Sequence, residues 1–111
     1  MYIEFKSTKL KRQCEQVEEG TRAWGRQIAH KVIRRINALK AADSIYDLSP
    51  LPPVRCHALK GPRQGQYAID VGERHRLVFG LMEAPVTTSE EEGTSPEHMV
   101  KILEVVDYHG K

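Results

Sequence analysis

Apolar residues in the first half of the chain recur at the spacing of a helix. Over residues 24–39 they are separated by three or four positions, which places them on one face of a helix. This stripe consists of Trp24, Ile28, Val32, Ile36 and Leu39. A second stripe over residues 10–17 predicts a preceding helix, capped by Ser7 or Thr8 and ended by Gly20. The pattern therefore predicts two N-terminal helices whose apolar faces belong to the core.

Other segments alternate between apolar and polar residues, or are continuously apolar, as strands are. These segments are residues 2–5, 54–59, 67–71, 77–81 and 99–106. Gly72 and Glu73 are predicted to form a tight turn that joins two of them into an antiparallel hairpin. We therefore expect an α+β fold over residues 1–111, a single domain with two N-terminal helices packed on a small, mostly antiparallel sheet of about four to five strands.

Residues 84–97 differ in composition from the rest of the chain. The segment has almost no apolar residue, so it is predicted to be a flexible acidic loop. It holds four of the 15 acidic residues and none of the 17 basic ones, so the remainder of the chain carries an excess of +6. Such a basic body suits an anionic partner such as RNA, although an ordinary charged surface is the alternative interpretation.

Several classes of protein are not favoured by the sequence. There is no apolar N-terminal signal segment and no apolar run long enough for a membrane span, so we expect a cytoplasmic protein with no membrane partner. Cys14 and Cys56 are far apart and are expected to be free thiols. No pair of Cys or His residues has the spacing of metal ligands, so neither a metal nor another cofactor is expected.

The polar face of the second predicted helix is basic. Its cations are Arg22, Arg26, Lys31, Arg34, Arg35 and Lys40, and no acidic residue lies between Arg22 and Ala42. Because like charges repel, an anionic neighbour would stabilise this face, and Arg34 and Arg35 are candidates for RNA binding. A solvated face is the alternative.

Three groups of polar residues have the chemistry needed to cut RNA. They are His57 with Lys60 and Arg63, Arg74 with Arg76, and the closing Asp107-Tyr108-His109. If the last strand pairs beside the hairpin, we expect the groups to meet at one end of the sheet. Cleavage without metal needs a base that takes the proton of the ribose 2′-OH, an acid that protonates the leaving 5′-oxygen, and cations near the phosphate.

Each group also has a simpler interpretation. The closing tripeptide can be a frayed tail, and Lys60 with Arg63 can be solvated turn residues. Arg76 is harder to explain in this way, because it lies in a predicted strand beside apolar Leu77 and Val78, where an arginine needs an anion.

These residues occur in segments that resemble a known family. The segments are residues 39–44, 47–48, 57–69, 76–79 and 107–109. They are similar to the HigB group of the RelE/ParE toxin superfamily, the plasmid-maintenance killer proteins. The combination of His-x-Leu-Lys-Gly-x-Arg-x-Gly with a terminal Asp-Tyr-His is the specific part of the resemblance, which extends over residues 33–109 apart from the acidic segment.

The resemblance implies a compact type II toxin that enters the ribosomal A site and cuts translated mRNA without metal. Its implied partners are the ribosome, mRNA and a helix-turn-helix antitoxin, through which it would reach operator DNA indirectly. The implied catalytic residues are His57, Lys60, Arg76, Asp107, Tyr108 and His109, and the further RNA-binding candidates are Arg63 and Arg74. His109 and Lys60 are the leading candidates for proton transfer, Arg76 for phosphate stabilisation and Asp107 for orienting a neighbour, while the assignment of base and acid stays open.

The chain departs from the family pattern at three places. His75 stands where an aromatic residue is usual, and Gly72 stands where a polar or basic residue is common, with Arg74 as a displaced substitute. Residues 84–97 are an insertion. Two alternatives to a nuclease are a ParE-like toxin that docks to a target such as DNA gyrase, and an inactive protein that only binds its antitoxin and acts as a co-repressor.

Overall fold

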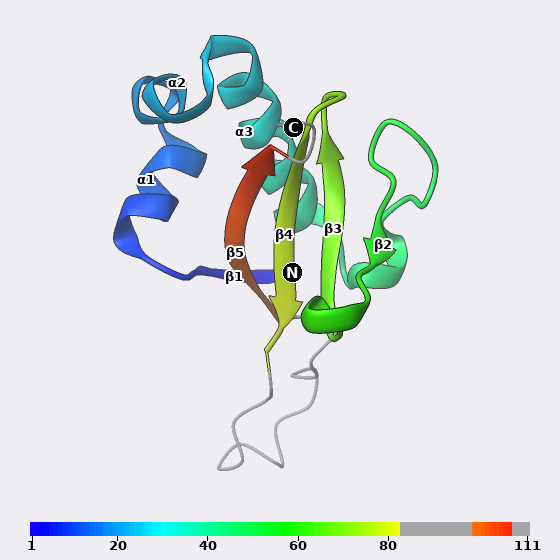
Figure 1. Ribbon diagram of the computed structural model, residues 1–111. Coiled ribbons are helices and arrows are strands. Elements are labelled where there is room, and N and C mark those ends of the chain that lie inside the picture. The colour runs from blue at the N-terminus through cyan, green and yellow to red at the C-terminus, as the bar shows by residue number, and fades with distance from the viewer. Residues whose placement is uncertain (83–98, 108–111) are drawn as a thin grey trace.

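Helices and strands divide the molecule into two layers (Figure 1). The structure, a computed structural model, describes residues 1–82 and 99–107, so the predicted acidic loop at 84–97 and the candidates Tyr108 and His109 lie outside the described residues. In chain order the elements are β1 (Tyr2–Phe5), α1 (Thr8–Glu15), α2 (Val17–Trp24), α3 (Arg26–Ala41), the 3-10 turn η1 (Ile45–Asp47), β2 (His57–Ala58), the 3-10 turn η2 (Gly61–Arg63), β3 (Gln66–Val71), β4 (His75–Leu81) and β5 (Met99–Asp107).

The five strands form one mixed sheet in the order β1-β5-β4-β3-β2. β1 is parallel to β5, and the other neighbours are antiparallel. The predicted α+β fold is confirmed, with β1 at one edge and β5 inside the sheet. The sheet is mixed rather than purely antiparallel because the chain passes through the helices before it returns to β5 beside β1.

The core lies between α3 and one face of the sheet. Val32, Ile36 and Leu39 of α3 are buried, and they belong to one cluster with Leu77 and Phe79 of β4. Burial of each such side chain stabilises the fold by about 1.5–3 kcal/mol relative to leaving it exposed. The predicted apolar stripe is therefore confirmed as a core surface over α3, with Ile28 packed at its border. Trp24, predicted on the same helix, instead ends α2 and also packs against the core.

The N-terminal region contains three helices instead of the predicted two. Ser7 caps α1 as expected, because its side-chain oxygen accepts a hydrogen bond from the Leu10 amide at 3.1 Å. Gly20 does not end a helix but lies buried inside α2, where a Cβ would be 2.7 Å from the Gln13 carbonyl oxygen and 2.9 Å from Ala29 Cβ. The glycine is needed for close packing, and Gly25, with φ +88°, ends α2.

Two strand predictions also differ from the structure. Of the predicted strand 54–59 only His57–Ala58 pairs in the sheet, because Arg55 adopts a left-handed conformation with φ +48° and interrupts extended backbone. The turn between β3 and β4 has three residues, from Gly72 to Arg74, rather than the two predicted.

No helix within residues 1–82 and 99–107 is long and apolar enough to cross a membrane. The same part of the chain contains no group of three or more His, Cys, Asp and Glu side chains that could hold a metal ion.

Candidate active site on the open face of the sheet

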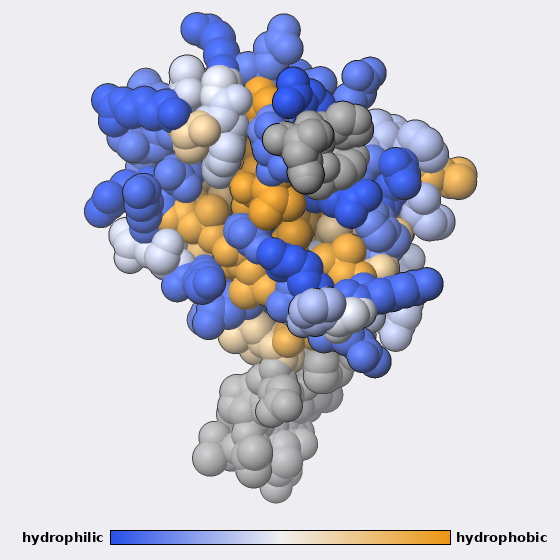
Figure 2. All heavy atoms as spheres, in the orientation of Figure 1, coloured by the Kyte–Doolittle hydropathy of each residue, from blue (hydrophilic) through white to orange (hydrophobic). Residues whose placement is uncertain are grey.

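The two faces of the sheet have different neighbours. Ile69, Val71 and Leu77 point into the core, so the alternate residues of β3 and β4 point to the opposite face, which we call the open face. In Figure 1 the helices lie on one side of the sheet, and the open face is turned toward the viewer. Figure 2 shows on it an apolar central area with hydrophilic side chains around it.

A buried carboxylate lies on the open face between two arginines. Asp70 of β3 is directly opposite Arg76 of β4, and its side chain is only 8% exposed. Its Oδ2 accepts a hydrogen bond from Arg55 at 3.1 Å, and its Oδ1 lies 4.0 Å from Arg76 Nε. The anion expected near Arg76 is therefore Asp70, while the 28% exposure of the Arg76 side chain leaves part of it accessible from solvent.

His57 belongs to the neighbouring row of the same face. It is opposite Ala68 in β3, and the row continues through Val78 to Glu104. The ring nitrogen Nδ1 lies 2.7 Å from the carbonyl oxygen of Arg55. Because a carbonyl oxygen can only accept a hydrogen bond, Nδ1 carries a proton, so in a neutral ring the lone pair lies on Nε2. This is the tautomer that a general base at Nε2 requires.

Arg55 holds both parts of this arrangement together. Its amide donates to the Leu51 carbonyl at 2.9 Å, its own carbonyl meets His57, and its guanidinium binds Asp70. Analysis of the sequence missed Arg55 and Asp70. Once the register of the hairpin is known, the alternation of β3 places Asp70 opposite Arg76 and so identifies it as part of the site. No local pattern in the sequence indicates that Arg55 has a left-handed conformation.

The turn that carries Lys60 and Arg63 lies before the start of β3, at the opposite end of this strand from Asp70. Lys60 is exposed and immediately precedes η2, where Arg63 donates to the side chain of Gln66 at 2.8 Å. Arg63 also pairs with the carboxylate of Glu104. A substrate phosphate would therefore have to compete with Glu104 for Arg63, and RNA binding by this residue stays a prediction.

Asp107 and Arg74 form a pair at the far end of the sheet. Arg74 Nη2 lies 3.7 Å from Asp107 Oδ2. Asp107 is opposite His75, in the row that faces the helices, whereas Arg76 is opposite Val106 on the open face. The expectation that all groups meet at one end is wrong for the described residues, because the hairpin places Lys60 and Arg74 at opposite ends of a six-residue strand, about 17–20 Å apart.

The basic face of α3 is partly neutralised by other elements. Lys40 pairs with Glu15 of α1 at 3.3 Å, and Arg35 Nε donates to the Asp70 carbonyl at 2.7 Å. Burial lowers the pKa of Arg35, the neighbouring charge of Arg34 lowers it further, and Asp70 opposes both effects. No acidic residue lies near these cations in the sequence of the helix, but acidic residues of other elements lie near them in the folded molecule. Roles of Arg34 and Arg35 in RNA binding stay predictions.

Cys56, between Arg55 and His57, does not supply a reactive thiolate. Burial raises the pKa of its thiol, so the group stays protonated at neutral pH. Both cysteines are free thiols.

Residues 3–89 match the family described as RelE-like toxin of the type II toxin–antitoxin system HigB. The chain belongs to this family of HigB-like toxins. It is therefore a member of a type II toxin group within the RelE/ParE superfamily, as the resemblance implied. No curated protein matches the sequence.

Solved structures of related toxins share the fold. A YoeB/ParE toxin from Agrobacterium tumefaciens has a TM-score of 0.58 at 12% identity, over 96% of this chain and 98% of that one. The YoeB–YefM complex from Staphylococcus aureus has a TM-score of 0.55 at 14% identity, over 98% and 97% of the two chains. A YafQ mutant from E. coli has a TM-score of 0.55 at 17% identity, over 96% and 92%. At these identities the likeness concerns the fold.

Proposed function

We propose that this HigB-like toxin is a ribosome-dependent endoribonuclease that cuts translated mRNA by attack of the ribose 2′-OH, without a metal ion. The observation that carries the proposal is the open face itself. There, His57 presents the lone pair of Nε2 on the same face as Arg76, one row away and with β3 between their strands, and Asp70 lies beside that arginine. A proton acceptor and a cation on one accessible face are what transesterification of an RNA phosphodiester needs.

In the proposed reaction His57 Nε2 takes the proton of the 2′-OH. The oxygen then attacks the adjacent phosphorus, and the bond from phosphorus to the 5′-oxygen breaks as the new bond forms. Arg76 stabilises the negative charge that grows on the phosphate oxygens. A general acid gives its proton to the leaving 5′-oxygen, which leaves a 2′,3′-cyclic phosphate and a free 5′-hydroxyl.

Lys60 and His109 are the candidates for that acid. Lys60 is exposed and immediately precedes η2. It lies on the same side of β3 as strand β2, which contains His57. His109 and Tyr108 follow Asp107, and we propose that Asp107, already placed by Arg74, orients one of them. His109, which the resemblance implies as a carrier of protons, is thus proposed as an acid rather than a base.

The proposed partners follow from the family. A helix-turn-helix antitoxin would neutralise the toxin and connect it to operator DNA, and the ribosome with its mRNA would be the cytoplasmic target. The fold shared with YoeB, which was solved in a YoeB–YefM complex, supports the pairing with a protein partner. A gene for a small helix-turn-helix protein directly beside this one would support the pairing.

Substitution of Arg76 tests the proposal. Arg76→Ala should lower mRNA cleavage on ribosomes by about 10²- to 10³-fold, because a donor that stabilises developing charge is lost. Arg76→Lys should recover only part of the rate, since an ammonium group lacks the planar fork of donors. Arg12→Ala, which removes an exposed arginine from α1, is the matched control and should cleave like the wild type.

Circular dichroism should show that each variant is folded, because Arg76 also lies beside buried Asp70. Full cleavage by folded Arg76→Ala would contradict the proposed role. Growth arrest without any mRNA cleavage by the wild type would instead favour a toxin that acts by docking.

A further inference from the structure

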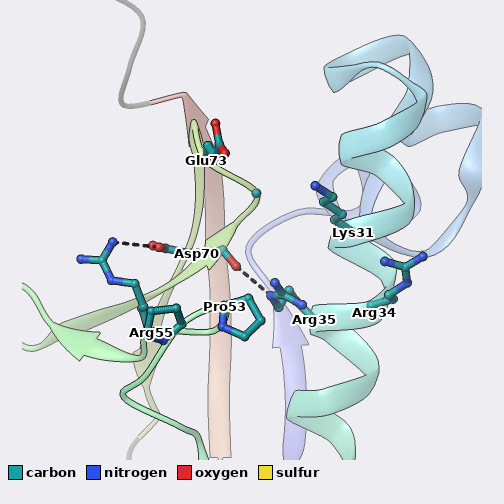
Figure 3. A pocket seen from close by; sticks show the side chains of 9 residues that line it. Lys31, Arg34, Arg35, Pro53, Arg55, Asp70 and Glu73 are labelled. Atoms are coloured by element: carbon teal, nitrogen blue, oxygen red, sulfur yellow. Dashed lines mark hydrogen bonds and ion pairs between the residues drawn. The ribbon is translucent and has the colours of Figure 1, made fainter.

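A groove runs between α3 and the segment before β2. It has a volume of about 570 Å³, and Figure 3 shows Lys31, Arg34 and Arg35 along one wall with Pro53 and Arg55 along the other. Asp70 lies at its base, so the groove adjoins the candidate active site from the side of the helices.

The groove has more positive than negative charge. Four cations line it together with two acidic residues, Asp70 and Glu73. Asp70 is already engaged, because its carboxylate binds Arg55 and its carbonyl oxygen binds Arg35. Lys31 and Arg34 have no ion pair within residues 1–82 and 99–107. An anion placed in the groove would therefore meet two cations that no side chain of this part of the molecule neutralises.

Lys31 connects this groove with a second hollow. A Cβ on Gly72 would lie in ordinary contact with Lys31, 3.4 Å from its Nζ and 3.6 Å from its Cδ, so the lysine lies against the β3–β4 turn. On the other side of that turn a hollow of about 480 Å³ shares Lys31 and leads to Arg74 and Asp107. The two hollows form one path around the end of the sheet, from the last residue of β5 to the wall of α3.

We infer that this path holds the phosphates of the RNA strand next to the cleaved bond, with Lys31 and Arg34 as the contacts in the groove. The inference rests on the proposed function and extends it to a second region of the surface. Continuity with the open face through Arg55, whose guanidinium binds Asp70, favours RNA over an acidic protein segment as the occupant. The contacts are to phosphate, so they hold the strand without selecting its sequence.

The test is binding of an RNA that cannot be cut. The probe is a fluorescent single-stranded RNA of about 12 nucleotides, with a 2′-O-methyl group on every ribose. Lys31→Gln/Arg34→Gln removes both charges but keeps most of each side chain. Lys9→Gln/Arg12→Gln is the matched control, because it removes the same two residue types at the same spacing from exposed positions of α1.

The salt dependence of binding decides the outcome. Loss of two phosphate contacts should lower the magnitude of the slope of log K, the binding constant, against log salt concentration by about 1.4. Between 50 and 200 mM salt the affinity of the wild type should therefore fall roughly sevenfold more than that of Lys31→Gln/Arg34→Gln. The control should keep the wild-type slope. Equal slopes for both double variants, or no binding by the wild type, would overturn the inference.

Two further results separate the alternatives. If Lys31→Gln/Arg34→Gln loses affinity for poly-glutamate but not for the RNA, the groove is a site for an acidic protein segment and the RNA assignment is wrong. If the wild type binds the RNA with the expected slope but cleaves no mRNA on ribosomes, RNA binding in the groove is supported and the proposed nuclease activity is wrong.

Discussion

Arg55 shows how one residue can organise a site through its backbone as well as its side chain. A left-handed conformation costs a residue with a side chain about 1–2 kcal/mol. Three contacts offset this cost, since each hydrogen bond contributes about 0.5–1.5 kcal/mol and one of them is charge-assisted. Two of these contacts fix groups of the candidate site, the Nδ1 proton of His57 and the carboxylate of Asp70. The strained backbone is thus coupled to the arrangement of His57, the proposed base.

A pair of substitutions separates the backbone of Arg55 from its side chain. Arg55→Gly and Arg55→Val both lose the guanidinium, but only glycine adopts φ +48° readily, and a β-branched residue is an outlier there. The valine variant should therefore displace the carbonyl that holds His57 and cleave mRNA about tenfold more slowly than the glycine variant, a difference of about 1.4 kcal/mol in barrier.

Nitrogen NMR gives a readout of the same pair that does not depend on activity. In neutral His57, the wild type and Arg55→Gly should carry the ring proton on Nδ1, and Arg55→Val should show a mixture of both tautomers. A wild-type ring protonated on Nε2, or identical spectra and rates for the two variants, would contradict the positioning role of Arg55.

At the scale of elements, the length of one turn decides which residues meet. A two-residue turn at Gly72-Glu73, as predicted from the sequence, would pair Asp70 with His75. The three-residue turn of the structure pairs Asp70 with Arg76. A shift of one residue moves a side chain to the other face of a strand, so the central ion pair of the site could not be derived before the turn was known.

The helices show the same limit of sequence analysis. The spacing of apolar residues identified the buried face of α3 correctly, because burial itself sets that spacing. The role of Gly20 could not be read from the sequence, because a glycine that ends a helix and one that allows two helices to approach look alike. Only the packed arrangement distinguishes them.

Gly20→Ala should destabilise the fold. Alanine normally stabilises a helix interior by about 1 kcal/mol over glycine. Here its methyl group would meet the Gln13 carbonyl oxygen at 2.7 Å and Ala29 Cβ at 2.9 Å, and such overpacking costs about 1–3 kcal/mol. Urea unfolding should show a lower free energy of unfolding than in the wild type.

Ala23→Gly in the same helix provides a comparison for Gly20→Ala. Ala23 is exposed, so this exchange should cost only the intrinsic preference of about 1 kcal/mol. An unchanged or increased stability of Gly20→Ala would show that α2 does not pack as closely on its neighbours as the structure indicates.

For the whole molecule, the sequence was sufficient for the α+β fold and for the family, but not for the layout of the site. His57 and Arg76 do share the open face, while Lys60 lies toward one end of β3 and Asp107 lies at the other end on the side of the helices. Motifs reveal which residues are present, whereas strand register determines where they point. The residues that connect the site, Arg55 and Asp70, belong to no motif that the sequence displayed.

The most direct test of the account is to determine the chemical ends of mRNA fragments made on ribosomes by the wild type and by a folded His57→Ala/Lys60→Ala/His109→Ala variant. The account predicts fragments with 2′,3′-cyclic or 3′-phosphate ends and free 5′-hydroxyls. The variant should yield fewer of them by at least about 10²-fold, the usual contribution of a general acid or base. Fragments with 5′-phosphates and 3′-hydroxyls, or an undiminished yield from the folded variant, would contradict cleavage by the 2′-OH at this site.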